Sequence, residues 1–583
     1  MIWSTTRKSG RNIFHHKITL KKCVQSWYNR YLSTVVTNPE HIKSEYDAIV
    51  IGAGHNGLTS AAYLAKHGLS VAVFERRHVI GGAAVTEEII PGYKFSRASY
   101  VLSLLRPLII KELNLKKYGL EVFLRSTAAF TPMLDNGFYG GKPPYLMLSS
   151  DPKLTYNEIS KFSENDAKAY FPYEDAMSRI SAAIKPILDS SPPVTSSSLF
   201  ESLQSSLPLL KSMRQLGADV GSFYELFTAP ISKILNRVFE SEPLKATLAT
   251  DGVIGAMLTP DTPGSGYVLL HHVIGECNNV QGSWGYVKGG MGSVSNAIAS
   301  SACDKGAQIF VSQPVKQICV ENESCIGVVL KGGQEIKSKM VLSNATPHVT
   351  FEKLIAKEKF VKHSDFLQHI SKFDYTSPVT KINVAVNKLP NFLACPNKPG
   401  NEVGEQHKGT IHLNCEKMSF LNDAFDDAQK GIPSSRPMIE MCIPSSIDPT
   451  LAPPGHHVIS LFTQYTPFYL NGDQKWTEND KANYASTVFS RIDDYAPGFQ
   501  ESIVGVDILT PSDLEEVIGL TGGNIFHGAM SLDQLFISRP SPLLPSCESP
   551  FRGLYLCGSG AHPGGGVMGS CGRLAALTAL KKK

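Results

Sequence analysis

The stretch from residue 46 to residue 82, YDAIVIGAGHNGLTSAAYLAKHGLSVAVFERRHVIGG, predicts a strand–helix–strand unit that binds a dinucleotide. Its first strand, residues 48–51, runs into the glycine turn GAGHNG, which has the spacing G-x-G-x-x-G. In this spacing the first glycine allows the tight turn, the second lets a pyrophosphate approach the backbone, and the third lets helix and strand pack closely. The second strand, residues 71–74, ends at Glu75, where a carboxylate accepts both hydroxyls of an adenosine ribose.

A glycine turn alone is weak evidence, because any tight strand–helix turn can use glycine. Here the strand, the helix, the second strand and the acid are all in register. A turn without a ligand would not need an acid at Glu75. The helix that begins near Asn56 directs its free N–H groups and its positive dipole end toward the phosphates. We therefore predict a dinucleotide site.

Two features favour FAD over NAD as the nucleotide. The glycine pair Gly81-Gly82 follows the acid closely and gives an extended flavin dinucleotide a further backbone surface. Near the C-terminus a second apolar strand, residues 554–557, leads into GSGAHPGGGVMG at 558–569, and an apolar helix, residues 572–580, follows. The N-terminus of that helix could stabilise negative charge at the N1–C2 edge of a reduced flavin. The alternative is an ordinary turn before a terminal helix.

Three of these motifs carry a family resemblance. The run FERRHVIGG that ends at Gly82, the middle glycine motif around Gly289, and the tail at 557–569 resemble the phytoene desaturase and carotenoid isomerase group of flavin amine-oxidase-like enzymes. The resemblance extends over nearly all of residues 46–580. It implies bound FAD, oxidoreductase or isomerase activity, and a mitochondrial address for this branch. It also implies that the backbone at Val315 holds the adenine, but it supplies no substrate.

The expected fold is α/β, with a discontinuous Rossmann-like FAD-binding domain of the glutathione-reductase type and an α+β substrate domain with mixed sheet and helices. We expect the FAD-binding domain to comprise residues 46–130, 285–350 and 546–583. The substrate domain then comprises residues 131–284 and 351–545, packed over the flavin.

Within the substrate domain, apolar residues recur at spacings of three and four between residues 151 and 250, which predicts helices. The Ser/Pro-rich stretch at 190–208 could instead be a mobile loop.

The residues expected to hold the cofactor lie in the two glycine turns, around the ribose acid and at the start of one later strand. They are Ile51, Gly52, Ala53, Gly54, His55, Asn56, Gly57, Glu75, Arg76, Arg77, Gly81, Gly82, Ala83, Val315, Gly558, Gly566, Val567 and Met568.

No residue is assigned as catalytic, because the flavin itself supplies the hydride chemistry. Candidate substrate-facing groups are Arg97, Tyr100, His271, His272 and His562. Each has a structural alternative. The arginine can pair with an acid or a phosphate, and the tyrosine can be a core residue with a satisfied hydroxyl. The adjacent histidines lie in an apolar stretch, and the last histidine can simply brace its turn.

The N-terminal residues differ in charge from the rest of the chain. The 583 residues carry a formal net charge of +4, but residues 1–39 hold seven Lys and Arg and no acid, so the remainder carries −3. This balance gives no sign of a nucleic-acid surface. The basic leader has no long apolar core, so it predicts a mitochondrial transit peptide rather than a secretory signal. A disordered basic tail is the alternative.

Other composition signals exclude whole classes of function. No window reaches about 18 consecutive apolar residues, so no transmembrane helix is expected. The 11 cysteines include no C-x-x-C motif, which argues against disulfide reductase chemistry. The histidine pairs lack cysteine or carboxylate partners at metal-ligand spacing, so no metal is expected.

The predicted function is that of a mitochondrial FAD-dependent oxidoreductase, in the matrix or at the inner membrane. It would dehydrogenate, saturate or isomerise a small apolar or amphipathic substrate by hydride transfer. Only one convincing dinucleotide fingerprint is present, so direct reduction by NAD(P)H is unsupported. The alternative is a flavin-containing, non-enzymatic binding or regulatory protein. Peripheral contact with the inner membrane, a protein partner and oligomerisation all stay open.

Overall fold

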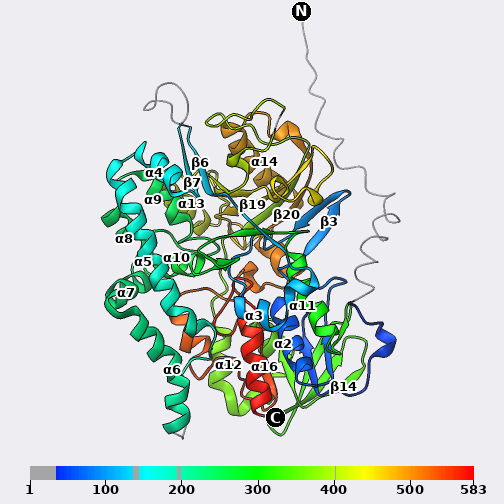
Figure 1. Ribbon diagram of the computed structural model, residues 1–583. Helices are drawn as coiled ribbons and strands as arrows, with labels where there is room; N and C mark the ends of the chain where they lie inside the picture. Colours follow the sequence, from blue (N-terminus) through cyan, green and yellow to red (C-terminus); the bar gives the residue numbers. More distant parts are fainter. Residues whose placement is uncertain (1–34, 135–143, 194–198, 401) are drawn as a thin grey trace, which may run out of the picture.

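The computed structural model describes residues 35–134, 144–193, 199–400 and 402–583. Two sheets organise these residues. A parallel sheet with its helices forms one part of the molecule, and a larger mixed sheet with a layer of helices forms the other (Figure 1). The α/β fold class predicted from the sequence is therefore confirmed.

The first sheet is five-stranded, with the order β11-β2-β1-β15-β23, and every neighbouring pair in it is parallel. Its strands are β1 (Ala48–Ile51), β2 (Val71–Phe74), β11 (Gln308–Phe310), β15 (Val341–Ser343) and β23 (Leu554–Leu556). Three distant segments of the chain thus form one sheet. β1 and β2 are buried along their whole length, as expected of strands covered on both faces.

Alternate residues of β1 face two different layers. Val50 packs with the helices α2 (His55–Lys66), α11 (Gly292–Cys303) and α16 (Ser570–Lys581). Ile49 instead packs with the antiparallel strands that cover the other face. Those strands are β12 (Val315–Glu321), β13 (Ser324–Leu330) and β14 (Glu335–Lys337). The period of two places a helical layer and a β-layer on opposite faces of the sheet.

The second sheet is seven-stranded and mixed, with the order β20-β16-β19-β18-β17-β6-β7. Only the pair β6–β17 is parallel. The strands are β6 (Thr127–Pro132), β7 (Tyr145–Ser149), β16 (Thr380–Val386), β17 (Thr410–Leu413), β18 (Met438–Cys442), β19 (His457–Gln464) and β20 (Ile503–Leu509). The boundary expected at residue 130 therefore lies inside β6. Helix α14 (Glu478–Tyr495) packs on one face of this sheet.

A layer of helices lies beside the second sheet (Figure 1). It consists of α4 (Pro152–Ser160), α5 (Glu164–Leu188), α6 (Leu199–Leu216), α7 (Val220–Thr228), α8 (Ile231–Val238), α9 (Glu242–Thr250) and α10 (Ser265–Val273). The helices predicted between residues 151 and 250 are thus confirmed. The loop suggested at 190–208 is wrong from Leu199 onward, because α6 begins there and continues through Pro208. Residues 194–198 lie outside the described part.

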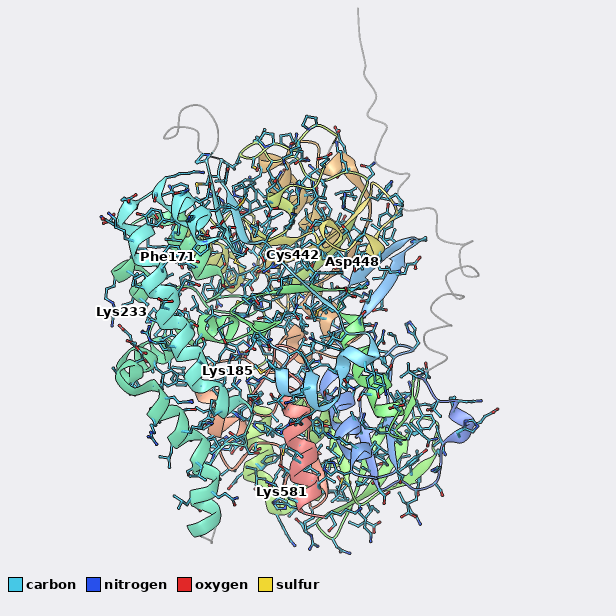
Figure 2. The ribbon with its side chains drawn as sticks, viewed as in Figure 1. Phe171, Lys185, Lys233, Cys442, Asp448 and Lys581 are labelled. Atoms are coloured by element: carbon cyan, nitrogen blue, oxygen red, sulfur yellow. The ribbon has the colours of Figure 1, made fainter. Side chains whose placement is uncertain are left out.

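Shorter elements complete the fold. They are β3 (Thr86–Ile90), β4 (Tyr93–Ser96), α3 (Pro107–Glu112), β5 (Val122–Leu124), β8 (Glu276–Cys277), β9 (Val280–Gln281), β10 (Gly285–Val287), α12 (Ser364–Ser371), α13 (Met418–Gln429), α15 (Pro511–Asp513), β21 (Pro540–Ser541) and β22 (Leu544–Pro545). Figure 2 shows how side chains fill the interior: Cys442 is fully buried on β18, whereas Lys233 on α8 extends into solvent.

Candidate functional site

The two glycine turns, far apart in the sequence, meet in the structure. The Asn56 side-chain amide donates a hydrogen bond to Ser559 Oγ at 3.1 Å, and Ser60 Oγ donates to the Gly572 carbonyl at 2.8 Å. A Cβ atom at Gly572 would lie 2.1 Å from the Asn56 carbonyl oxygen, so only glycine allows this approach. The N-terminal ends of α2 and α16 therefore lie against each other.

The first turn has the geometry that its glycines were expected to provide. Gly52 has a φ of 91°, which favours glycine. A Cβ at Gly57 would lie 2.1 Å from the Gly52 carbonyl oxygen, so a side chain there would push the helix off the strand. Gly54 is the N-cap residue of α2, so no side chain caps the first N–H groups of this helix. Ile51 and Ala53 are buried on either side of Gly52.

The glycine pair packs directly against the first turn. The Gly81 N–H donates to the Ala53 carbonyl at 2.8 Å, and a Cβ at Gly82 would lie 3.2 Å from the Gly54 Cα. Ala83, the next residue, lines the cavity described below. The pair thus extends the backbone surface formed by the first turn.

Glu75 lies at the end of β2 and is buried. One carboxylate oxygen accepts from the Ala53 N–H at 2.7 Å, and the other accepts from the Arg77 N–H at 2.8 Å. The Gln313 N–H donates to the Glu75 carbonyl at 2.8 Å, so the chain that leads into Val315 at the start of β12 runs beside the acid. The carboxylate is therefore held in place by backbone N–H groups next to the glycine turn.

The arginines after the acid are engaged with other parts of the protein. Arg76 donates to the main-chain oxygens of Glu516 and Val517 at 2.9 and 3.1 Å. Arg77 forms an ion pair with Glu87 at 2.8 Å. Their guanidinium groups tie the turn to neighbouring segments.

The second turn is conformationally unusual. Gly566 and Val567 have φ angles of 103° and 59°, and both line the cavity. A left-handed β-branched residue is an outlier, and such backbone is concentrated at functional sites. A Cβ at Gly558 would lie 2.8 Å from the Asn344 carbonyl oxygen, and the Met568 carbonyl accepts from the Arg106 N–H at 3.1 Å.

The junction of the two turns fits a bound dinucleotide. Neither α2 nor α16 has a side-chain cap or an acid in its first turn, so their N-terminal donors stay available. His55 Nε2 and Asn56 Oδ1 are buried and have no hydrogen-bond partner among the described residues. Buried polar atoms normally have partners. An extended polar ligand lying across the junction would supply them.

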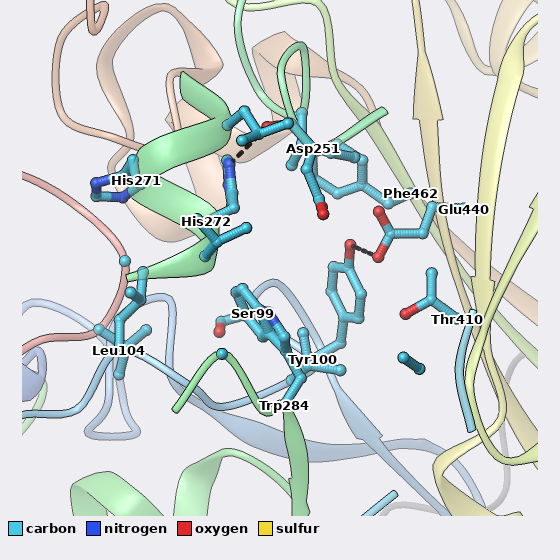
Figure 3. A pocket seen from close by; sticks show the side chains of 18 of the residues that line it. Ser99, Tyr100, Leu104, Asp251, His271, His272, Trp284, Thr410, Glu440 and Phe462 are labelled. Atoms are coloured by element: carbon cyan, nitrogen blue, oxygen red, sulfur yellow. Dashed lines mark hydrogen bonds between the residues drawn. The ribbon is translucent and has the colours of Figure 1, made fainter. Parts of the chain in front are cut away.

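A cavity of about 510 Å³ is lined by residues of this junction and of the seven-stranded sheet. Figure 3 shows part of its lining. His55 and Val567 line it at the glycine turns, and Leu104, Trp284 and Phe462 are among its apolar walls. This volume lies in the range of small-molecule and cofactor sites. The cavity thus connects the dinucleotide turns to the seven-stranded sheet.

One row of side chains crosses the sheet wall of the cavity. The cross-strand pairs are His412 with Glu440, Glu440 with Phe462, and Phe462 with Lys381. Residues directly opposite one another point to the same face of a sheet, and all four line the cavity. Sequence reasoning missed this row. The available signal was one charged residue in a mostly apolar strand, namely Lys381 in KINVAVN and Glu440 in MIEMC.

Burial shifts the pKa values of the ionisable groups in this wall. Loss of solvation raises the pKa of Glu440 to about 7 and lowers that of Lys381 to about 7. It also raises the pKa of Asp251, whose carboxyl group faces the same space as Glu440 (Figure 3). Tyr100 Oη donates to Glu440 Oε1 at 2.7 Å. The wall therefore holds exchangeable protons near neutral pH.

The structure divides the five candidate substrate-facing residues. Tyr100, His271 and His272 line the cavity. Arg97 does not, because it forms a bidentate pair with Asp507, with both distances 3.1 Å. His562 does not line it either; its Nε2 lies 2.9 Å from the Ile187 carbonyl oxygen.

The two cavity histidines differ in their surroundings. His272 Nδ1 contacts two carbonyl oxygens, those of Val268 and Asp251, at 2.8 and 2.9 Å, so this nitrogen carries the proton. His271 Nε2 is buried with no partner among the described residues, and burial holds the pKa of this histidine well below its usual value. A Cβ at Gly566 would lie 3.2 Å from that nitrogen. His271 therefore presents an unpaired ring nitrogen beside the second glycine turn.

The described cysteines are all free. Cys319 and Cys325 lie in the hairpin formed by β12 and β13. Burial raises the pKa of Cys557 to about 12 and that of Cys571 to about 11, so both remain thiols. Over the residues that the structure describes, no group of three or more His, Cys, Asp or Glu could hold a metal ion.

Comparison with known proteins agrees with this architecture. Residues 50–108 match a family model described as an NAD(P)-binding Rossmann-like domain. Putrescine oxidase bound to putrescine superposes with a TM-score of 0.54 at 16% identity, over 92% of this chain and 98% of that one. The chain therefore shares the fold of putrescine oxidase.

Full-length sequence comparison gives a closer assignment. Pyridine nucleotide-disulfide oxidoreductase domain-containing protein 2 of Rattus norvegicus is 58% identical over 543 residues, which cover 92% of this chain and 93% of the relative. The chain belongs to the family of that protein.

More distant relatives cover nearly as much of the chain. A limonene dehydrogenase polypeptide of Castellaniella defragrans is 25% identical over 91% of this chain and 94% of its own length. Prolycopene isomerase of Daucus carota is 26% identical over 90% and 78%. The family relationship predicted from the sequence motifs is confirmed.

Proposed function

We propose that this protein is an FAD-dependent oxidoreductase that exchanges a hydride between flavin and an apolar or amphipathic substrate held in the cavity. One observation carries the proposal. The cavity of about 510 Å³ is continuous from the two glycine turns, at His55 and Val567, to the buried row on the seven-stranded sheet, at Glu440. A cofactor at one end and a substrate at the other would share one cavity.

The residues around the junction have separate roles in holding FAD. The Glu75 carboxylate would accept the ribose hydroxyls, and the uncapped N-terminus of α2 would face the pyrophosphate. The N-terminus of α16 would face the ring and favour negative charge there. The chain at Val315 would lie against the adenine. When bound, FAD supplies the hydride acceptor or donor.

The cavity wall supplies the other requirements of such a reaction. Leu104, Trp284 and Phe462 exclude water and bind apolar carbon. Tyr100 and Glu440 share a hydrogen bond and hold a proton at Glu440 near neutral pH, because burial raises the pKa of that carboxyl to about 7. This pair is positioned to donate or accept the proton that accompanies a hydride transfer.

The substrate class rests on the walls and on the relatives. Two relatives that each match at least nine-tenths of this chain are named for limonene and for prolycopene, both hydrocarbons. The apolar walls and these two relatives support a reaction like those of the phytoene desaturase group, namely dehydrogenation, saturation or isomerisation of an apolar molecule.

Disulfide reduction is not proposed, despite the family's name. No cysteine lines the cavity in the described part of the chain, and burial keeps Cys557 and Cys571 in the thiol form. A dithiol relay needs two reactive thiols within reach of the ring.

We also propose a mitochondrial location, at the matrix or the inner membrane, on the strength of the basic, acid-free residues 1–39. Residues 1–34 lie outside the described structure. Fusing residues 1–45 to a fluorescent protein tests this directly. A mitochondrial signal supports the location, and a diffuse cytosolic signal overturns it.

Purified full-length protein tests the reaction. A bound yellow chromophore that bleaches with a terpenoid substrate, together with product analysis by mass, would support the enzyme. A product that is lighter than the substrate by two hydrogen atoms indicates dehydrogenation, and a product with the mass of the substrate indicates isomerisation. Protein that binds no flavin would overturn the proposal. Flavin that stays inert to every donor, with a protein partner recovered from mitochondria, would favour the non-enzymatic alternative.

A further inference from the structure

Helices α6 and α7 expose a ridge of apolar side chains, which we call the α6–α7 ridge. It comprises Leu203, Leu207, Leu210 and Met213 on α6 and Tyr224 on α7, with exposed fractions of 60%, 55%, 53%, 36% and 67%. The residues on α6 follow one another at spacings of four, three and three, so they share one face of the helix. That face is turned to solvent.

α6 exposes leucines on one face, at Leu203, Leu207 and Leu210, and buries both leucine and serine on the other, at Leu216 and Ser212. Ser212, on the inward face, is fully buried, and its hydroxyl has no hydrogen-bond partner within the described residues. Ser205 and Ser206 are also turned partly inward. A helix that only covers a protein core buries its leucines and exposes its serines. The three exposed leucines, Leu203, Leu207 and Leu210, are therefore placed for contact with something outside this chain.

The charges around the ridge are basic. Lys211 and Arg214 are exposed on α6, and neither takes part in an ion pair with the described residues. Two acids beside the ridge are ion-paired: Asp219 is bound by Arg179 at 2.9 Å, and Glu225 is bound by an arginine at 2.8 Å. A surface that meets the ridge should be apolar in its interior and anionic at its rim.

The ridge lies on α6 and α7, and α6 packs against α5, the helix that borders the cavity. α6 runs along the margin of the molecule (Figure 1). The bond between Arg179 and Asp219 fastens the junction of α6 and α7 to α5. On the same helix, Asp175 and Ser178 are exposed residues of the cavity lining. Whatever covers the ridge lies close to this side of the cavity.

We propose that the α6–α7 ridge docks the protein on the surface of an anionic lipid bilayer. Leucines and methionine on one face with flanking cations are the composition of interfacial helices, and anionic headgroups would pair with Lys211 and Arg214. A second copy fits less well, because a two-fold contact places the same patch against itself and brings these cations together. Among the described residues no helix has the length and apolarity to cross a bilayer, so the contact is peripheral. The proposal does not rest on flavin chemistry.

Vesicle co-sedimentation of the full-length protein tests the proposal. We expect binding to vesicles of equal parts phosphatidylcholine and phosphatidylglycerol, and much weaker binding to phosphatidylcholine alone. Leu207→Gln with Leu210→Gln should weaken binding by roughly tenfold for each leucine that no longer enters the interface. Lys211→Gln with Arg214→Gln should weaken it by roughly fivefold for each cation and remove the preference for the anionic lipid.

A matched control is the same substitution at an exposed apolar residue that lies outside the ridge. Val361 is 79% exposed, so Val361→Gln should leave vesicle binding unchanged. All substituted side chains lie at the surface, and circular dichroism with thermal unfolding would verify that each variant is folded. Flavin content measured on the same samples keeps this result separate from the proposed activity.

Three results would overturn the proposal. The first is wild-type protein that binds neither vesicle, and the second is a leucine variant that binds as well as wild type. The third is a concentration-dependent dimer that the leucine substitutions convert to monomer, which would assign the ridge to a second copy of the chain.

Discussion

Replacing Gly54 by alanine separates the binding role of the glycine turn from its role in folding. The added methyl group would lie 2.6 Å from Asn344 Nδ2, which is the end of a flexible side chain, and 3.9 Å from the Gly82 Cα. At Gly57 the same change would meet the Gly52 carbonyl oxygen at 2.1 Å, and that atom belongs to the backbone. The first clash can be relieved by rotating an amide, whereas the second requires the helix to move.

The expected magnitudes differ accordingly. In Gly54→Ala the methyl group keeps the pyrophosphate from the N–H groups of the turn. Losing one charge-assisted hydrogen bond costs about 1.5–3 kcal/mol, which is roughly a tenfold to hundredfold loss of FAD affinity. The free energy of unfolding of the apoprotein should change by about 1 kcal/mol or less. In Gly57→Ala the overpacked turn should lower that free energy by about 1–3 kcal/mol.

The assay compares flavin content after purification, FAD affinity by fluorescence titration of the apoprotein, and thermal unfolding. Gly332→Ala is the control, because no heavy atom lies within 4 Å of its Cβ position and its backbone is not left-handed. A Gly54→Ala protein with wild-type FAD affinity would refute the placement of the pyrophosphate at this turn. Equal destabilisation of the two glycine variants would refute the distinction between binding and folding.

Three further predictions follow from the cavity and the ribose acid. Glu75→Gln removes the charge that would hold the ribose, so the same titration should show FAD binding weaker by about 1.5–3 kcal/mol; unchanged affinity would place the ribose elsewhere. Tyr100→Phe removes the hydroxyl that donates to Glu440 and favours its ionised form, so the pKa of Glu440, about 7, should rise. An upward shift of the acidic limb in the pH profile of flavin reduction would report this, and an unmoved profile would separate Glu440 from the reaction. Burial lowers the pKa of Lys381 from 10.5 to about 7, so between these values the unfolded chain binds a proton that the folded chain does not. Stability should therefore fall as pH drops through this window, by at most about 1.4 kcal/mol per pH unit, and urea unfolding of Lys381→Met should lack this contribution.

Local signals were sufficient to predict the dinucleotide half of the fold. β1 and β2 have the bounds expected from the sequence, because a buried parallel strand ends where its glycine turn or its acid begins. The meeting of the two glycine turns was also predicted, and the bond between Asn56 and Ser559 shows it. The roles of the individual cofactor-binding residues stay predictions.

The substrate half depends on pairings that the sequence does not encode locally. The row of His412, Glu440, Phe462 and Lys381 exists only because four separate strands align in one register. Arg97 was a candidate for contact with substrate, but its partner, Asp507, is 410 residues away in the chain. At α6 the Ser/Pro content suggested a loop, but the residues from Leu199 to Leu216 form a helix.

The interleaving of the two domains has a consequence for biosynthesis. A ribosome delivers β1, β2 and α2 early, then most of the seven-stranded sheet, and only afterwards β23 and α16. A nascent chain thus contains the first glycine turn long before the second, which is synthesised when translation is nearly complete. Loading of the proposed flavin would therefore be a late event, after β23 and α16 have been synthesised. Variants in which the larger sheet fails to assemble should consequently accumulate without flavin, even when every glycine of the two turns is intact.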